Sequence, residues 1–332
     1  MATVDTTRLD TEYRALTEGC GLVDRSARGK LALTGSGAKE FLAGQTTNDI
    51  EALTPGAGCY AAFLTPKGKM LGDLRVLDCG EELLLDTERM ALQALFDMIR
   101  RFKIGYDVQL HKRTVERGLL SLIGPTAARV AGAERLPETE HANTAVEIEG
   151  IAAVAARTDT GVDLLCDAAD TDEMGRALRD RGATSASEAA AEIIRVEHGR
   201  PRYGIDLDDT VIPQEAGLNE RAVSFTKGCY VGQETVARLF YKGKPNRHLR
   251  GLRLSAPAAP GAELLADRRS RRSTIGGERP VGRLTSAVLS PAHGPIGLAL
   301  VRREAEPGTS VSVGEPEHGA GAEVVELPFA AR

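Results

Sequence analysis

The sequence has few aromatic residues and no excess of positive charge. Aromatic side chains make up 4% of its 332 residues, Trp is absent, and the formal net charge is −5. Proteins that bind single-stranded nucleic acid stack bases on aromatic rings, and nucleic-acid-binding surfaces carry clustered positive charge. We therefore expect no direct binding of nucleic acid.

The sequence also lacks segments that would direct the chain into or across a membrane. Residues 1–19 are polar and carry an acid from Asp5 onward, without the basic and apolar regions of a secretory leader. No apolar run approaches the ~20 residues that a membrane-spanning helix requires. We expect a cytoplasmic protein with no membrane partner, and the length predicts two or three domains.

Cysteine motifs and the common catalytic motifs are missing as well. No C-x-x-C occurs, which argues against a disulfide framework and a preformed zinc or cluster site, so we expect no bound metal. No dinucleotide-binding, P-loop, nucleophile-elbow or H-E-x-x-H motif is present. The acidic run "DLDD" (206–209) lacks the glycine and glutamate offsets of a calcium loop. The cysteines are scattered at positions 20, 59, 79, 166 and 229.

The first 250 residues alternate between strand and helix patterns. Residues 29–35 alternate polar and apolar and predict a strand, and Ser36 is placed to cap the helix that follows. Residues 88–103 carry apolar side chains at helical spacing. Strands and helices recur between 125 and 185, and a helix is predicted from Ser187 to Arg195. These patterns indicate an α+β region with antiparallel sheets.

The composition changes after residue 250. Short strand patterns punctuated by Gly and Pro follow, without a helix signal, and predict an all-β barrel or sandwich. The basic, glycine-bearing segment 266–280 is typical of a solvated hairpin loop, although it could also contact an anionic partner. We therefore expect an α+β region over 1–250 and a β domain over 251–332.

The stretch "TKGCYVGQET" (226–235) places one cysteine between two glycines. "VSFT" (223–226) predicts a strand and "GQETVARLFYK" a helix that begins near Gly232, so Cys229 would lie in a tight connection. A cation such as Lys227 and a helix N-terminus both stabilise a thiolate, which is the reactive form. The alternative is a small buried side chain without chemistry, and the residues alone leave both open.

The stretch "TPKGKMLGDLRV" (65–76) carries a single carboxylate, Asp73, among apolar neighbours on a predicted strand. If these neighbours desolvate the carboxylate, its pKa rises and it can act as a general acid or base. The alternative is an Asp at a strand edge that faces water. A third polar stretch, residues 195–218, is long for a loop in a compact domain and is therefore a candidate functional loop.

Together these stretches resemble the folate-binding superfamily of the glycine-cleavage T-protein, an aminomethyltransferase. "GLVDRSARGKLALTGSGAKEFLAGQTTNDI" (21–50) is similar to its N-terminal motif and "GRLTSAVLSPAHGPIGLALV" (282–301) to its barrel motif. The resemblance implies two intertwined α+β subdomains and a C-terminal β-barrel around a folate-sized channel, with tetrahydrofolate as the ligand. It also implies four residues that line this channel: Tyr60, Asp73, Arg195 and Tyr203.

Within the superfamily, "KGCYVGQE" (227–234) resembles the distinguishing motif of the YgfZ branch. Proteins of that branch act in making or maintaining iron–sulfur enzymes, including enzymes that thiolate tRNA. The resemblance implies iron–sulfur client proteins or assembly machinery as partners, and Cys229 with Lys227 as the working groups. The remaining motif positions are Gly228, Tyr230, Gly232, Gln233 and Glu234.

Two positions depart from the T-protein pattern. Gly72 stands where the T-protein has the first of two aspartates, and Val162 stands where an acid that holds the pterin is expected. A lost charge-assisted hydrogen bond would cost ~1.5–3 kcal/mol, or about ten- to a hundredfold in affinity. The departures predict weak folate binding and count against aminomethyl transfer.

Three hypotheses remain open from the sequence. The first is a folate-binding accessory protein for iron–sulfur enzymes with Cys229 as the key thiol. The second is a tetrahydrofolate-dependent aminomethyl or one-carbon transferase, which predicts turnover that is indifferent to Cys229→Ser. The third is an interaction scaffold with a vestigial folate site, which predicts tolerance of Asp73→Ala. The sequence does not decide whether the protein turns over a substrate.

Overall fold

The computed structural model describes residues 6–266, 280–314 and 319–329. Residues up to Ala191, together with Asn219–Gln233, form one compact unit. Glu192–Leu218 and the residues from Glu234 onward form a second unit. We refer to these as unit 1 and unit 2. The domain division expected at residue 250 stays a prediction, and the basic loop predicted at 266–280 lies, apart from its two end residues, outside the described residues.

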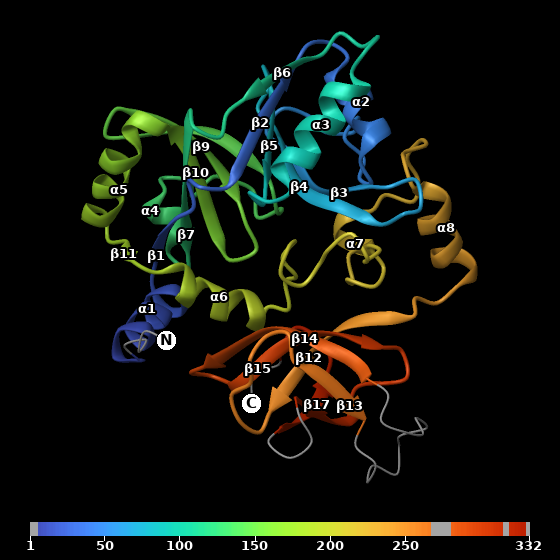
Figure 1. Cartoon of the computed structure of the whole chain (residues 1–332). Coiled ribbons are helices and arrows are strands. Elements are labelled where there is room, and N and C mark those ends of the chain that lie inside the picture. Colours follow the sequence, from blue (N-terminus) through green and yellow to red (C-terminus); the bar gives the residue numbers. More distant parts are fainter. Residues whose placement is uncertain (1–5, 267–279, 315–318, 330–332) are drawn as a thin grey trace. The chain divides into compact units, whose positions relative to one another are not determined.

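The first sheet of unit 1 has five antiparallel strands in the order β3-β4-β5-β2-β6. Helix α3 (Leu92–Phe102) packs on β2 and β4, and α2 (Ala38–Gln45) follows β2 (Figure 1). The strands are β2 (Gly29–Thr34), β3 (Gly58–Leu64), β4 (Met70–Asp78), β5 (Leu83–Thr87) and β6 (Gln109–Lys112).

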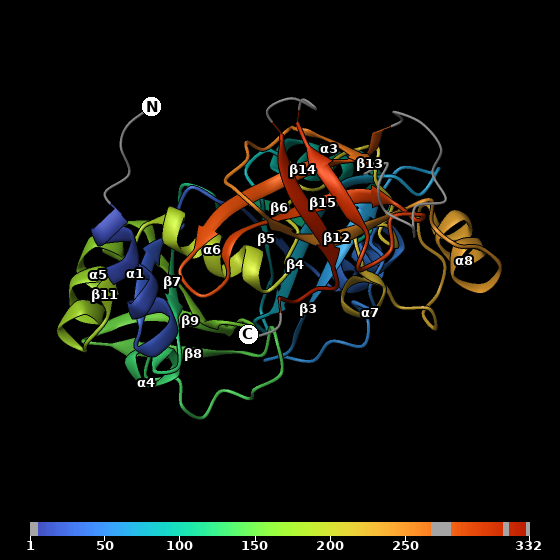
Figure 2. The same ribbon diagram turned by 90° about the horizontal axis from the view of Figure 1, so that it is seen from below.

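The second sheet of unit 1 has the order β11-β1-β7-β10-β9-β8, with a parallel pair only at β1–β11. Helices α1 (Thr6–Glu18), α4 (Ala127–Val130) and α5 (Thr171–Asp180) pack beside it, and Figure 2 shows α1 next to β11. A short 3₁₀ turn, Ala168–Asp170, precedes α5. The strands are β1 (Gly21–Asp24), β7 (Arg117–Ile123), β8 (Asn143–Ile148), β9 (Ile151–Arg157), β10 (Gly161–Asp167) and β11 (Thr184–Ser185).

The two sheets share an apolar core because their strands turn alternate side chains inward. Leu77 and Leu84 of the first sheet meet Leu119 and Leu165 of the second in one buried cluster. Helices α4 and α5 pack on the opposite face of the second sheet, in a larger apolar cluster that includes Val162. The expected pair of intertwined α+β subdomains is confirmed.

Unit 2 contains a closed barrel in the order β12-β15-β14-β13-β16-β17, which confirms the predicted β-barrel. Its interior is filled by aliphatic side chains such as Leu252, Leu264 and Val301. Its strands are β12 (Arg247–Leu254), β13 (Glu263–Ala266), β14 (Pro280–Ser290), β15 (Gly294–Arg302), β16 (Ser310–Val313) and β17 (Ala320–Val325). Helices α6 (Glu188–Glu197) and α8 (Gln233–Lys242) cross the unit boundaries, and α7 (Asn219–Ala222) belongs to unit 1.

The helix predicted from Ser187 is present as α6, and the Ala190 backbone N–H donates to Ser187 Oγ at 3.3 Å at its start. The one predicted serine cap, that of α2 by Ser36, is wrong, because Gly37 precedes that helix and the hydroxyl of Ser36 donates to Asp107 Oδ2 at 2.7 Å. A side-chain acceptor in a neighbouring loop has replaced the local cap.

The strand predicted for "VSFT" (223–226) is also wrong, because these residues form an irregular segment after α7. The Lys227 backbone N–H donates to Ser224 Oγ at 3.3 Å, and the Ser224 N–H donates to the carbonyl of Thr47 at 3.0 Å. A serine that accepts bonds from the following backbone offers an alternative to strand pairing.

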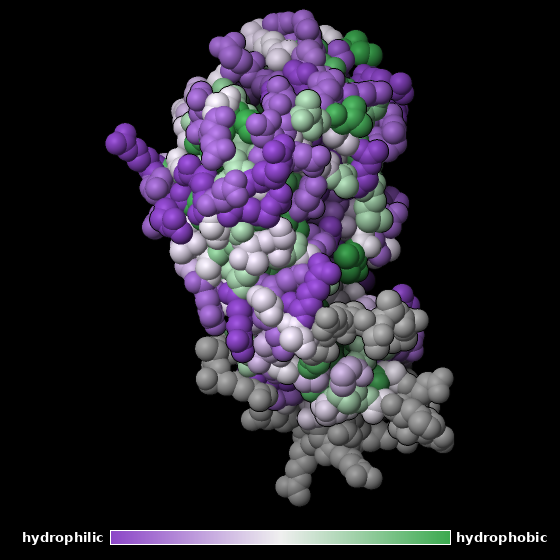
Figure 3. All heavy atoms as spheres, turned by 90° about the vertical axis from the view of Figure 1, so that its left-hand side faces the viewer, coloured by the Kyte–Doolittle hydropathy of each residue, from purple (hydrophilic) through white to green (hydrophobic). Residues whose placement is uncertain are grey.

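Among the described residues, no helix is both long and apolar enough to cross a membrane. On the face shown in Figure 3, hydrophilic residues predominate and hydrophobic ones form small separate patches. Scattered hydrophobic residues of this kind are normal for a protein surface and do not indicate an interaction site.

Candidate functional site

A cavity of about 170 Å³ lies within unit 1. Strands β4, β5 and β10 contribute to its walls, together with the turn at 158–160, residues of the loop before β8, and α7. Four arginines and five carboxylates line it, along with Tyr60 and His141. This concentration of charge in a small space makes it the candidate site.

Tyr60 and Asp73 lie on adjacent strands, β3 and β4, and meet in this cavity. The Tyr60 hydroxyl donates to Asp73 Oδ2 at 2.5 Å, and Asp73 is only 6% exposed. Burial raises the pKa of Asp73 to about 6, although the Tyr60 bond and the charges of Arg28 and Arg221 oppose this shift. The predicted desolvation is confirmed, and the water-facing alternative is wrong. A carboxyl with such a pKa can both accept and donate a proton near neutrality.

Gly72 faces the other side of β4. A Cβ at this position would lie 2.5 Å from Phe63 Cζ and 2.8 Å from Ala91 Cβ, so the Phe63 ring requires a glycine here. Successive residues of a strand point to opposite faces, and Asp73 is the one that faces the cavity. The expectation that Gly72 removes a carboxylate from the ligand site is therefore corrected.

The same alternation corrects the interpretation of Val162. Its side chain is fully buried in the apolar cluster under α4 and α5, whereas its neighbour Asp163 lines the cavity. Asp159, in the turn before β10, lines it too. Acids are therefore present in this wall, and Asp163 lies one residue beyond the position where the resemblance placed an acid. The alternating pattern of "GVDLLCD" (161–167) is the signal that could have found Asp163.

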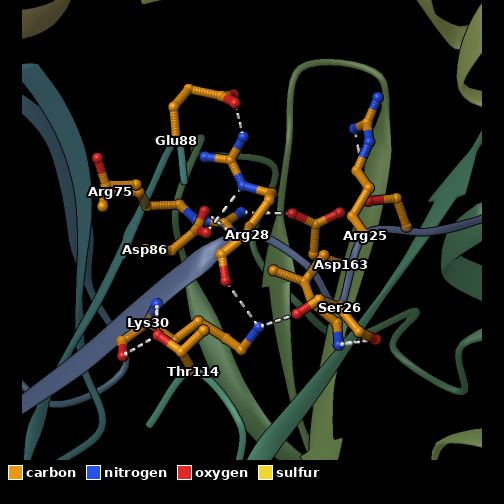
Figure 4. A network of polar contacts seen from close by, with 12 residues as sticks. Arg25, Ser26, Arg28, Lys30, Arg75, Asp86, Glu88, Thr114 and Asp163 are labelled. Carbon is orange, nitrogen blue, oxygen red and sulfur yellow. Dashed lines mark hydrogen bonds and ion pairs between the residues drawn. The ribbon is translucent and has the colours of Figure 1, made fainter. Parts of the chain in front are cut away.

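A partly buried ion-pair network adjoins the cavity, and Figure 4 shows its carboxylates around two arginines. Arg28 Nε donates to Asp86 Oδ1 at 2.8 Å, and its Nη1 pairs with Glu88. Arg75 Nη1 donates to Asp163 Oδ2 at 2.7 Å, and its Nη2 lies 3.1 Å from Asp86 Oδ2. Although burial acts in the opposite direction, these arginines hold the pKa of Asp86 below its usual value. The network fixes the charge of Arg28 close enough to influence Asp73.

The turn before β2 is held by a buried lysine in the same network. Lys30 Nζ donates to the carbonyl oxygens of Ser26 and Arg28 at 2.7 and 3.1 Å (Figure 4). Burial lowers the pKa of Lys30. Both the backbone carbonyl and the side chain of Arg28 are thereby held by polar contacts.

Arg221, at the end of α7, closes another side of the cavity. Its guanidinium carbon lies 4.6 Å from the centre of the Tyr60 ring, and its Nε donates to Glu140 Oε2 at 3.1 Å. A cation over an aromatic face is an attractive contact. Tyr60 is therefore held between Arg221 on its ring and Asp73 at its hydroxyl.

Cys229 lies on a turn that is anchored on both sides. Lys227 Nζ donates to the carbonyls of Ala43, Thr46 and Asn48, at 2.5–2.8 Å. On the other side, Gly232 has φ +88°, and a Cβ there would lie 2.7 Å from the Thr65 carbonyl oxygen. The side chain of Cys229 between them is exposed, so the buried alternative is wrong.

Lys227 has partners other than the thiol. Burial lowers the pKa of its amine to about 8, and its three N–H donors point to backbone carbonyls. These contacts give Lys227 a structural part in holding the turn, and its predicted action on Cys229 stays a prediction. Of the five cysteines, all within the described residues, Cys229 alone is exposed. Burial raises the pKa of Cys20 and Cys79 to about 11, and that of Cys59 to about 12.

The other motif residues support the turn. Tyr230 is 7% exposed, and Lys227 Nζ lies 5.1 Å from the centre of its ring. The backbone N–H of Gln233 donates to the Tyr230 carbonyl at 3.2 Å where α8 begins, and Glu234 is exposed in the first turn of that helix. A Cβ at Gly228 would meet nothing within 4 Å.

Arg195 and Tyr203, predicted to line the same channel as Tyr60, belong to unit 2. Arg195 Nη1 donates to Asp206 Oδ2 at 2.6 Å, and its Nη2 donates to Ser286 Oγ at 2.7 Å. Tyr203 is half-buried and forms a backbone bridge with Leu207. The structure thus brings Tyr60 and Asp73 together, and contact of Arg195 and Tyr203 with a ligand stays a prediction.

Two α+β subdomains, each with its own sheet, and a six-stranded barrel define a protein of the glycine-cleavage T-protein class. Residues 4–227 match the family described as GCVT N-terminal domain, and residues 247–330 match the glycine cleavage T-protein C-terminal barrel domain. The chain belongs to this family.

Relatives are similar along almost the whole chain. An aminomethyltransferase of Geobacillus kaustophilus is 30% identical over 338 residues, covering 96% of this chain and 89% of that protein. A putative chloroplastic transferase of Arabidopsis thaliana is 29% identical over 336 residues, covering 97% and 74%. The crystal structure of the glycine cleavage system aminomethyltransferase T from Bartonella henselae has a TM-score of 0.83 at 24% identity, covering 97% and 89%. This last likeness confirms the fold.

Proposed function

We propose that the protein binds tetrahydrofolate, with the pterin head in the cavity of unit 1 and Asp73 as the proton-transferring group beside it. The observation that carries this proposal is the buried Tyr60–Asp73 pair, in which burial raises the pKa of Asp73 to about 6. Perturbed carboxyls in a cavity are typical of functional sites. Membership of the T-protein family supports a folate as the ligand.

The size and chemistry of the cavity fit a pterin. A cavity of roughly 150 Å³ accepts a benzene-sized molecule, and drug-sized ligands need roughly 300–1,000 Å³. At about 170 Å³, this cavity can take a compact ring system and leaves the aminobenzoyl-glutamate part outside. Pterins present N–H donors beside a carbonyl oxygen, and the walls supply carboxylate acceptors and arginine donors.

Asp73 would exchange a proton with the ligand, and its neighbours would orient it for this transfer. Bound tetrahydrofolate supplies nitrogens that carry a one-carbon unit. Near neutral pH Asp73 is mostly ionised, because its pKa is about 6, so it can accept a proton from a ligand nitrogen and return it. The Tyr60 hydroxyl orients the carboxylate, and Arg221 fixes the Tyr60 ring.

One reaction that this arrangement supports is aminomethyl or one-carbon transfer. Relatives that cover almost the whole chain are named aminomethyltransferases. The presence of Asp73 on the cavity side of β4 removes the objection raised by Gly72. A transferase of this kind would need the cavity and would be indifferent to Cys229.

The second candidate is an accessory role for iron–sulfur enzymes, such as tRNA-modifying methylthiotransferases, as the YgfZ-like motif implies. It is favoured by one observation, the exposed thiol of Cys229 on a turn held by Lys227 and Gly232. A single thiol suits transient contact with a cluster or a sulfur donor, because resident clusters are normally held by four cysteines. In this role the partners would be client proteins or the assembly machinery.

Binding is tested by calorimetric titration of the purified protein with tetrahydrofolate under anaerobic conditions. We expect saturable binding that weakens about ten- to a hundredfold in Asp73→Asn, because a charge-assisted hydrogen bond is lost. Absence of saturable binding by the wild-type protein would overturn the proposal and leave the scaffold hypothesis.

The two roles are separated in a deletion strain complemented with wild type, Cys229→Ser, Asp73→Ala and the control Cys79→Ser. We would measure the activity of a tRNA methylthiotransferase in these strains and aminomethyl transfer by the purified variants. Full rescue of the methylthiotransferase by Cys229→Ser excludes the accessory role as stated. Turnover lost in Asp73→Ala but retained in Cys229→Ser supports the transferase.

A further inference from the structure

His141 has an unusual backbone conformation at the edge of the cavity. Its φ is +71°, and Glu149 is the other non-glycine residue with positive φ in the described parts of the chain. The His141 N–H donates to the Arg157 carbonyl at 2.9 Å, and Asn143 Nδ2 donates to the His141 carbonyl at 3.4 Å. Left-handed backbone at a non-glycine residue is disfavoured, and it persists where the surroundings impose it, often at ligand sites.

The strand β3 accommodates this conformation. A Cβ at Gly58 would lie 2.6 Å from the His141 carbonyl oxygen and 3.0 Å from the His141 Cβ. Gly58 therefore provides the space in which His141 turns. His141, which this turn positions, lines the cavity together with Arg75, Asp159 and Arg221.

The imidazole is buried without hydrogen bonds. His141 is 7% exposed, and neither ring nitrogen has a hydrogen-bond partner among the described residues. Glu140 Oε1 lies 3.6 Å from Nε2, beyond hydrogen-bond distance, and both Glu140 oxygens are engaged by Arg221. Burial lowers the pKa of His141 to about 4, so the ring is neutral near pH 7 and offers one N–H donor and one acceptor.

Buried polar atoms without partners are rare in proteins, because each loses its hydrogen bonds to water. Arg75 Nε, in a residue that lines the same cavity, is a second buried donor without a partner in the described part of the chain. Three hydrogen-bonding groups are thus left without partners among the described residues: the Arg75 Nε–H donor, the imidazole N–H donor and the imidazole acceptor nitrogen. A ligand edge that carries a ring N–H beside a carbonyl oxygen, as in a lactam, complements this set.

We propose that His141 is a ligand-contacting residue that selects for a fused heterocycle with a lactam edge, with one ring nitrogen accepting the ligand N–H. The inference rests on the proposed function, because the pterin of tetrahydrofolate has such an edge. It adds a specificity residue that pairs with the ligand as a neutral base. His141 thereby complements Asp73 on the same ligand.

Two variants test His141, and both are chosen so that the backbone conformation at this position is retained. His141→Gly removes the imidazole and relaxes the backbone, because glycine readily adopts positive φ. His141→Asn keeps a donor and an acceptor, and Asn tolerates this conformation better than most residues. Glu149→Gly is the matched control, since it relaxes the other positive-φ residue, which is exposed in the β8–β9 turn.

Affinities for tetrahydrofolate and for pterin would be measured by calorimetry, with p-aminobenzoyl-glutamate as a probe that lacks the pterin. We expect His141→Gly to weaken tetrahydrofolate and pterin binding at least tenfold and His141→Asn to weaken it less. Glu149→Gly should bind as the wild type does. Added imidazole should restore part of the affinity of His141→Gly, which a merely structural role would not produce.

The outcomes distinguish this inference from the proposed function. If the wild type binds neither tetrahydrofolate nor pterin, both are overturned. If the wild type binds and folded His141→Gly binds equally well, the inference fails and the folate site stands. If the variants do not fold, ¹⁵N-histidine spectra of the wild type decide. A ring signal that shifts on saturation with tetrahydrofolate supports the contact, and unchanged signals for all six histidines overturn it.

Discussion

Asp73 and Cys229 are the two candidate reactive groups of unit 1, and their surroundings differ in kind. Asp73 is buried, accepts a hydrogen bond from Tyr60, and has a pKa raised to about 6 by burial. Cys229 is exposed on a turn whose neighbours are anchored and whose lysine is engaged with backbone carbonyls. The protonation of Asp73 therefore depends on its buried surroundings. The reactivity of Cys229 depends instead on which molecules have access to its exposed thiol.

The largest expected effect tests which face of β4 meets the cavity. Gly72→Asp should destabilise the protein by roughly 3–5 kcal/mol, because its Cβ would overlap the Phe63 ring and its carboxylate would be buried without partners. Urea denaturation followed by circular dichroism measures this. As a control, Gly44→Ala in α2 should be neutral or slightly stabilising, since a Cβ there meets nothing within 4 Å. A stable Gly72→Asp variant with altered ligand binding would contradict the assigned face.

Asp73→Asn should separate stability from function. The pKa of Asp73 is about 6 in the folded protein and about 3.9 when unfolded, so between these values the folded state binds a proton that the unfolded state releases. Stability therefore falls as pH rises from about 4 to 6, and the full penalty remains at pH 7. We expect Asp73→Asn to be about 2–3 kcal/mol more stable than wild type at pH 7, with no gain below pH 4.

Denaturation midpoints over pH 3.5–8 would measure this difference. Asp180→Asn, at an exposed position at the end of α5, is the control and should show no such pH-dependent gain. A gain that is the same at pH 4 and pH 7 would show that the charge of Asp73 is not its cause.

Lys227→Met should loosen the turn that carries Cys229. The variant leaves three carbonyl oxygens without their shared donor, at a cost of about 1–3 kcal/mol. We expect a lower urea midpoint and faster proteolysis within residues 224–232, measured by mass spectrometry. The exposed Lys67→Met is the control. Unchanged proteolysis would argue that Tyr230 and Gly232 hold the turn without the lysine.

The smallest effect on stability is expected for Cys229→Ser, within about 0.5 kcal/mol, because the side chain is exposed. In the wild type, iodoacetamide should modify Cys229 before the four other cysteines, which are buried or half-buried. Peptide mapping over time measures this order. Earlier modification of Cys79 or Cys59 would show that exposure does not determine the reactivity of Cys229, and would contradict the contrast drawn here with the buried Asp73.

Much of this arrangement follows from sequence patterns, and the exceptions have physical causes. The strands, the barrel and the desolvation of Asp73 were predictable, because alternation and apolar neighbours are local properties. The resemblance to the T-protein pointed to position 162 and missed Asp163, because a motif does not show which face of the strand each residue occupies. The strand expected before Cys229 failed because Ser224 supplies competing backbone contacts.

His141 gave no signal in the sequence. Its positive φ is imposed by contacts with Gly58, Asn143 and Arg157, two of which are distant in sequence. The lack of hydrogen-bond partners for its ring among the described residues is likewise visible only in the folded structure. Lys227 illustrates the same limit, because its three acceptors lie about 180 residues earlier in the chain. Groups whose role is fixed by long-range contacts cannot be assigned from neighbouring letters alone.

Unit 1 is assembled from two separate stretches of chain, and this has a consequence for its synthesis. Arg221, which rests on the Tyr60 ring, and Lys227, which binds the end of α2, both come from Asn219–Gln233. A ribosome must therefore complete the intervening Glu192–Leu218 before the cavity can acquire its last wall. A fragment that stops at Ala191 would contain both sheets and Asp73, yet would lack these two stabilising cations.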